Sequence, residues 1–109
     1  MKFKTQIQKL GIEQEVENII ANCECGETNT ARIVELPKLR KWEIIEVIGN
    51  YLDDETIDCD WWDIKQLKTF CKVFDINPKN LSSYYAAAIS EGGYEIAYAI
   101  NEDIVLVLE

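Results

Sequence analysis

The chain has 109 residues, of which 48% are hydrophobic and 28% charged, and this predicts one folded domain rather than a disordered polypeptide. Twenty acidic residues against eleven basic ones, with no histidine, give a formal net charge of −9, which argues against binding to nucleic acid or to anionic membranes. No apolar run approaches the roughly 20 residues that span a bilayer, and the first residues lack the apolar core of a secretory signal. We therefore expect a cytoplasmic protein.

Residues 1–17 give the weakest pattern in the chain. Residues 1–12 mix lysine, glutamine and apolar side chains and end near Gly11, so either a first strand or a loose arm fits them. We assign residues 1–17 no role and treat residues 18–109 as one acidic domain.

Two strands are predicted next. Residues 15–23 have a β-branched centre, and residues 31–37 alternate apolar and polar side chains until Pro37 stops the run. Turn-forming residues fill positions 25–30 between them. Together these segments predict a hairpin.

Residues 38–52 change to a helical period. Apolar side chains recur at the i, i+3 and i+4 spacing of a buried helix face, at Ile44, Ile45, Ile48, Tyr51 and Leu52. Glu43 and Glu46 fall on other faces of this helix. Residues 56–60 can then extend as a short strand.

The second half of the chain is mainly helical in pattern. Helices are predicted at residues 62–74, 81–90 and 94–101, and a strand at residues 103–109. Asn77 and Pro78 fit a helix cap followed by proline, and Gly92 and Gly93 fit a helix end. The order of elements predicts an α+β fold, with a small, mostly antiparallel sheet of 3–4 strands packed with 3–4 helices.

The residues needed for catalysis are mostly missing. The chain has no histidine to act as a general base at neutral pH, and no glycine-rich loop follows a predicted strand to hold phosphate. Asp58 and Asp60 could hold Mg²⁺ or act as an acid and base pair, and these stay minor alternatives. We predict that the protein is not an enzyme.

The cysteine spacing does not favour a metal site. Cys23 and Cys25 are closer together than in the usual C-x₂₋₄-C pair, and Cys59 and Cys71 are 12 positions apart. No histidine could complete a zinc site. Without a secretory route we expect reduced thiols, and we predict no metal and no cofactor.

Negative charge is concentrated in residues 43–64, which hold eight carboxylates and no lysine or arginine. The eight are Glu43, Glu46, Asp53, Asp54, Glu55, Asp58, Asp60 and Asp63. Carboxylates two apart on a strand, as at Asp58 and Asp60, lie about 6.7 Å apart, and those three apart on a helix are also neighbours. Successive phosphates along a nucleic-acid strand are separated by roughly 6–7 Å. An acidic run without internal cations therefore suits a cationic groove on a partner protein.

Two tryptophans, Trp61 and Trp62, lie within this acidic run. At a strand-to-helix junction they would point in different directions, so one is expected in the core and the other partly exposed. An exposed tryptophan beside acids would act as an anchor at a protein interface.

Several landmarks in this order resemble the ArdA-type antirestriction proteins. They are "IIAN" (19–22), "ELP" (35–37), "WEIIEVIGNYLDDE" (42–55), "IDCDWW" (57–62), "IKQLKTF" (64–70) and "AAAISEGGYEIAYAINEDIVL" (86–106). The likeness covers residues 18–109, and each motif by itself is weakly specific. The early loop departs from the family pattern, because "CECGETNTARIVE" (23–35) lacks its tyrosine and tryptophan.

This resemblance implies a DNA mimic that inhibits a restriction-modification enzyme or a related defence nuclease by occupying its DNA-binding groove. The eight carboxylates would take the place of phosphates, and Trp61 and Trp62 would be candidate interface aromatics. The partner would be a DNA-binding protein with a basic groove. Dimerisation could double the charged length, and the strand at 103–109 either offers an edge for it or is a central core strand.

Two other functions fit an acidic domain of this size. An immunity protein or antitoxin could block the basic active site of a toxin or nuclease, and a housekeeping domain could be acidic only to stay soluble. The basic residues Lys38, Arg40 and Lys41 form a local patch that a pure DNA mimic would not need.

Overall fold

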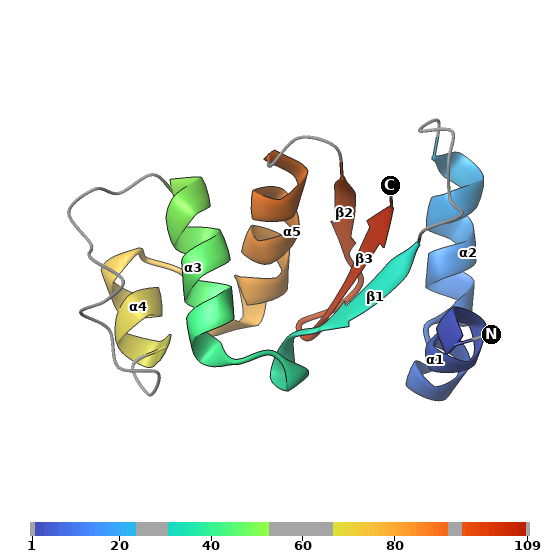
Figure 1. Ribbon diagram of the computed structural model, residues 1–109, viewed down its shortest axis with the longest axis horizontal. Coiled ribbons are helices and arrows are strands. Elements are labelled where there is room, and N and C mark those ends of the chain that lie inside the picture. Colours follow the sequence, from blue (N-terminus) through green and yellow to red (C-terminus); the bar gives the residue numbers. More distant parts are fainter. Residues whose placement is uncertain (1, 24–30, 53–66, 92–94, 109) are drawn as a thin grey trace.

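The described part of the chain folds as a three-stranded antiparallel sheet with helices on both faces (Figure 1). The computed structural model describes residues 2–23, 31–52, 67–91 and 95–108. The elements in chain order are α1 (Lys2–Leu10), α2 (Glu13–Asn22), β1 (Arg32–Glu35), the 3-10 turn η1 (Leu36–Lys38), α3 (Lys41–Leu52), α4 (Leu67–Val73), the 3-10 turn η3 (Pro78–Asn80), α5 (Leu81–Glu91), β2 (Ile96–Ala99) and β3 (Ile104–Leu108). The predicted α+β class is confirmed, with five α-helices in the described part of the chain.

The sheet has the order β1-β3-β2, with β3 in the centre. Val34 of β1 pairs with Val105, and Tyr98 of β2 pairs with Leu106. All five residues of β3 are buried, because "IVLVL" offers an apolar side chain to both faces of the sheet. Since β1 and β2 occupy both edges of this strand, it has no edge left through which two copies could dimerise.

Helices α3 and α5 cover one face of the sheet, and α4 lies on the outer side of α3 (Figure 1). The apolar stripe of α3 enters this core through Ile44, Ile45 and Ile48, as its period predicted. Ile48 and Phe70 of α4 are completely buried. This packing fixes which sides of α3 remain open to a partner.

Helices α1 and α2 cover the opposite face, and here three predictions were wrong. Residues 1–12, expected as a strand or a loose arm, contain helix α1, whose Ile7 is buried in the core. Residues 15–23 form most of helix α2 rather than a strand, so the predicted hairpin with residues 31–37 does not exist. The buried side of α2 follows a helical period at Val16, Ile19, Ile20 and Cys23, and that period outweighs the β-branched composition. Gly11, with a φ of +68°, makes the turn between α1 and α2.

The prediction of a helix at residues 94–101 was also wrong, because Ile96–Ala99 form strand β2. Strand β2 pairs with β3, and the Ala97 N–H donates to Ser90 Oγ of α5 at 2.9 Å. These contacts come from distant parts of the chain and override the local helical pattern. The predicted strand at 56–60 and the first part of the helix at 62–74 lie outside the described residues.

The other predicted elements of the second half are present. Helix α5 matches residues 81–90, and α4 matches the described end of 62–74. The side chain of Asn77 caps η3 by accepting a hydrogen bond from the Lys79 N–H at 3.1 Å, with Pro78 next to it. None of the described helices is long and apolar enough to cross a membrane.

Candidate partner-binding surface

Two of the eight predicted carboxylates, Glu43 and Glu46, belong to the described structure, and both are on α3. The other six predicted carboxylates and both candidate aromatics lie outside the described residues, namely Asp53, Asp54, Glu55, Asp58, Asp60, Asp63, Trp61 and Trp62. The geometry of the candidate surface therefore starts from α3.

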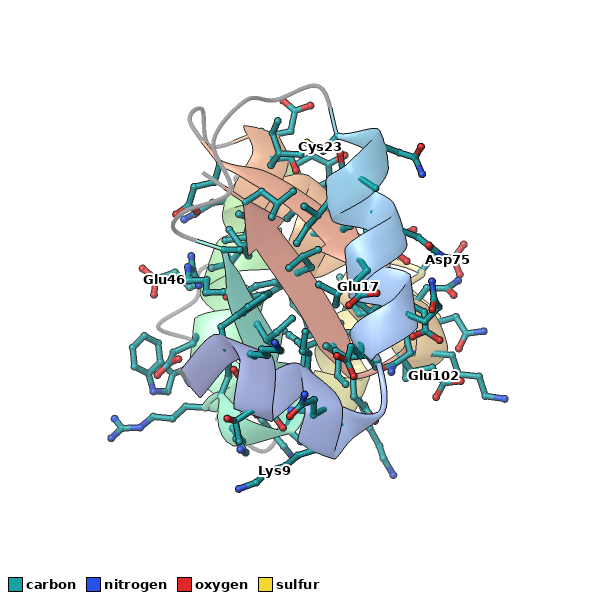
Figure 2. All side chains as sticks on the ribbon, turned by 90° about the vertical axis from the view of Figure 1, so that its right-hand side faces the viewer. Lys9, Glu17, Cys23, Glu46, Asp75 and Glu102 are labelled. Carbon is teal, nitrogen blue, oxygen red and sulfur yellow. The ribbon has the colours of Figure 1, made fainter. Side chains whose placement is uncertain are left out.

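Helix α3 holds Glu43 and Glu46 one turn apart, away from its buried stripe. The stripe at Ile44, Ile45 and Ile48 fixes the rotation of the helix against the sheet and α5. Glu43 is half-buried, whereas Glu46 is exposed and projects from the side of the molecule in Figure 2. Side chains at this i, i+3 spacing start about 5–6 Å apart at Cβ, close to the spacing of adjacent phosphates.

Neither glutamate is neutralised by a described cation. The described residues form two ion pairs, Arg32 Nη2 with Glu95 Oε1 at 3.3 Å and Lys38 Nζ with Glu35 Oε2 at 2.8 Å. Both pairs leave Glu43 and Glu46 without an ion-pair partner among the described residues. Within the described residues, no cation competes with a partner for either charge.

The two glutamates differ in their surroundings. The Tyr85 side chain of α5 is buried, and burial raises its pKa above the usual value. Nearby charges act on this pKa in both directions, because Arg32 lowers it whereas Glu43 and Glu95 raise it. Since Glu46 is exposed and Glu43 is half-buried, Glu46 is the more accessible of the two for a partner.

Acidic side chains of the described residues are not confined to α3. Figure 2 shows Glu46 at the left of the molecule, Glu17 on the helix that faces the viewer, and Asp75 and Glu102 at the right. Glu17 belongs to α2, and Glu102 lies in the turn between β2 and β3. A surface that contacts a partner through α3 would therefore use only part of the total negative charge.

The two described cysteines lie on opposite faces of the sheet. Cys23 is partly buried and packs against the core between the sheet and α1/α2, whereas Cys71 is buried in the core on the other face. Burial raises the pKa of the Cys71 thiol, which disfavours the reactive thiolate. No group of three metal-ligating side chains occurs within the described ranges. Cys25 and Cys59 lie outside them.

One exposed residue was not identified from the sequence. Trp42 in the first turn of α3 is 41% exposed, next to Arg40 and Lys41. The sequence signal for its exposure was its position beside the apolar stripe of α3 rather than on it.

Comparisons of the chain with protein-family models, with curated proteins and with solved structures each gave no match.

Proposed function

We propose that the protein is a non-catalytic DNA mimic of the ArdA type. It would occupy the DNA-binding groove of a restriction-modification enzyme or a related defence nuclease. The carboxylates of residues 43–64 would take the positions of DNA phosphates, beginning with Glu43 and Glu46 on α3.

The observation that carries this proposal is that neither α3 glutamate forms an ion pair with another described residue. The described cations Lys38 and Arg32 pair with Glu35 and Glu95. Beyond Glu46 the sequence continues to residue 64 without a cation. Many like charges close together in the sequence repel one another, and a cationic groove on a partner would offset that repulsion.

The proposal is tested by inhibition of DNA cleavage across a panel of restriction enzymes and other defence nucleases. We expect inhibition that is competitive with DNA and that weakens steeply as salt concentration rises. A quadruple variant with Asp53, Asp54, Asp58 and Asp60 changed to Asn should lose inhibition by roughly 100-fold or more, because several close charge pairs with the groove would be lost.

A matched control changes the same number of carboxylates elsewhere. Glu15, Glu17, Glu91 and Glu102 are exposed, and their change to Gln alters the net charge by the same amount. This control should inhibit almost as well as the unchanged protein. Full inhibition by the Asp-to-Asn variant, or equal loss in both variants, would reject DNA mimicry by residues 43–64. An immunity protein would instead inhibit a single cognate enzyme and no other member of the panel.

A further inference from the structure

The positive charge of the chain is concentrated in two short segments. Residues 1–12 and 36–42 contain six of the eleven basic residues and no acid. The remainder of the chain has five basic residues against twenty acids. Within the net charge of −9, positive and negative charges are therefore strongly separated along the sequence.

The fold brings these two segments together. Glu35 Oε2 accepts a hydrogen bond from Gln6 Nε2 of α1 at 3.0 Å and contacts Lys38 Nζ of η1 at 2.8 Å. In Figure 1, α1, η1 and the first turn of α3 all lie along the lower edge of the molecule. Lys9 is one helical turn from Gln6 and projects outward at this same end in Figure 2. We call this surface the basic end, and its residues are Lys9, Lys38, Arg40, Lys41 and Trp42.

The basic end is held on a fixed turn. Leu36 is buried, Leu39 packs against the core, and the Leu39 N–H donates to the Leu36 carbonyl at 3.0 Å. The Arg40 carbonyl then accepts from the Glu43 N–H at 3.0 Å as α3 begins. The backbone that carries the side chains between these anchors is therefore fixed, which lowers the backbone entropy lost when a partner binds.

The basic end is also available for contact. Lys9, Arg40 and Lys41 are exposed and form no ion pair with any other described residue. Trp42 leaves 41% of its surface open, although burying an indole in the core would be strongly favourable. Tryptophan and arginine are the residue types most enriched at the energetic centres of protein interfaces.

The chemistry at this end favours an acidic protein segment over nucleic acid. A nucleic-acid strand carries a charge about every 3.4 Å and would continue from the basic end onto surfaces rich in carboxylates. Single-strand binding also uses successive aromatic platforms, whereas Trp42 is the only aromatic residue of the described basic end. A short acidic segment ends before it meets the acidic surface, and an apolar side chain in it could pack on Trp42.

We propose that the basic end docks an acidic segment of a partner protein, with an apolar side chain of that segment against Trp42 and its carboxylates on Arg40, Lys41 and Lys9. This proposal goes beyond the inhibitory function, because it uses none of the carboxylates assigned to DNA mimicry.

The test uses the full chain labelled with ¹⁵N and three probes followed by NMR. The probes are a synthetic peptide of about twelve residues rich in Glu with two Leu, the same peptide with Gln in place of Glu, and a single-stranded oligothymidylate of similar length. We expect the acidic peptide to shift the amide signals of residues 38–42 in a saturable way. The Gln peptide and the oligonucleotide should bind at least about tenfold more weakly.

Two charge-reversal variants make the test specific. Arg40→Glu with Lys41→Glu should weaken peptide binding about tenfold or more, and acids at the start of α3 are compatible with the helix dipole, so the fold should be kept. Lys72→Glu with Lys79→Glu makes the same change in net charge at exposed sites in α4 and η3 and should bind within about twofold of the unchanged protein.

Trp42→Ala should also weaken binding without changing the net charge. Three results would overturn the proposal: no saturable shift at residues 38–42 with the acidic peptide, equal weakening by both charge-reversal variants, or oligonucleotide binding as tight as that of the peptide.

Discussion

Helix α3 starts and ends in different electrostatic surroundings. Arg40 and Lys41 are at its start, whereas its last turn contains no basic residue and three acids, at positions 53–55, follow in the sequence. A helix is stabilised by negative charge near its start and by positive charge near its end, and only Glu43 in the first turn follows this rule. The arrangement of charge along α3 is therefore not explained by the stability of the helix. We infer that both ends are kept for binding, to an acidic segment at the start and to a cationic groove beyond the end.

The largest change in stability is expected when a buried side chain that anchors α3 in the core is truncated, because this packing supports both ends of the helix. Ile48 is completely buried between α3 and the sheet, so Ile48→Ala should lower the free energy of unfolding by about 2–5 kcal/mol. Urea unfolding followed by circular dichroism measures this change. Ile48→Val is the matched control, with an expected loss of about 0.5–1.5 kcal/mol. A loss below about 1 kcal/mol for Ile48→Ala would show that α3 is not anchored as described.

The next prediction concerns the start of α3. Replacing Arg40 and Lys41 by Glu should raise the free energy of unfolding by about 0.5–1 kcal/mol at low salt, because acids there complement the helix dipole. Binding of the acidic peptide should fall in the same variant. Thermal unfolding at low and high salt measures the gain, which should shrink as salt screens it. A loss of stability would contradict the reasoning about the helix start.

A third prediction concerns the end of α3. Asn50 is exposed in the last turn, so Asn50→Lys should raise stability by about 0.3–1 kcal/mol. The new cation also lies close in sequence to the acidic residues and should weaken inhibition of DNA cleavage. Asn50→Gln keeps the charge unchanged and should alter neither property. Unchanged inhibition by Asn50→Lys would show that the end of α3 is not part of the inhibitory surface.

The smallest effect concerns Glu35, which joins α1 to the basic end. Hydrogen bonds from Lys38 and Gln6 lower the pKa of Glu35 below its ordinary value of 4.5. A carboxyl with a lowered pKa in the folded state stabilises the fold above its unfolded pKa, and this contribution is lost as pH falls through the lower folded pKa. The stability of the unchanged protein should thus decrease more than that of Glu35→Gln as pH falls below about 4.5. Parallel stability curves for the two proteins would contradict this contribution.

Sequence patterns predicted α3, α5, β1 and β3. Helix α3 buries the face that its apolar period defines, whereas β3 is apolar throughout and is buried on both faces. Helix α2 was predicted as a strand, since Ile19 and Ile20 suggested β-branched composition, although Val16 and Cys23 complete a helical period. Strand β2 depends on pairing with β3 and on the Ser90–Ala97 hydrogen bond, which local sequence does not reveal.

The two candidate surfaces also differ in how far local sequence predicts them. Glu43 and Glu46 could be placed on the open side of α3 from its period alone, because that period is local. The basic end could not be predicted as one surface. Its two segments are far apart in the sequence, and only the folded chain brings them together. The Gln6–Glu35 hydrogen bond, which joins α1 to the residue before the second segment, spans 29 positions. Long-range contacts of this kind leave no periodic signal in the sequence.

We propose that carboxylates following α3 replace DNA in the cationic groove of a nuclease. The most direct measurement is the inhibition of DNA cleavage by a sensitive nuclease at increasing DNA concentrations, comparing the unchanged protein with the variant in which Asp53, Asp54, Asp58 and Asp60 are changed to Asn. We predict that added DNA relieves inhibition by the unchanged protein and that the variant does not inhibit. Inhibition that is independent of DNA concentration, or that survives in the variant, would contradict the account.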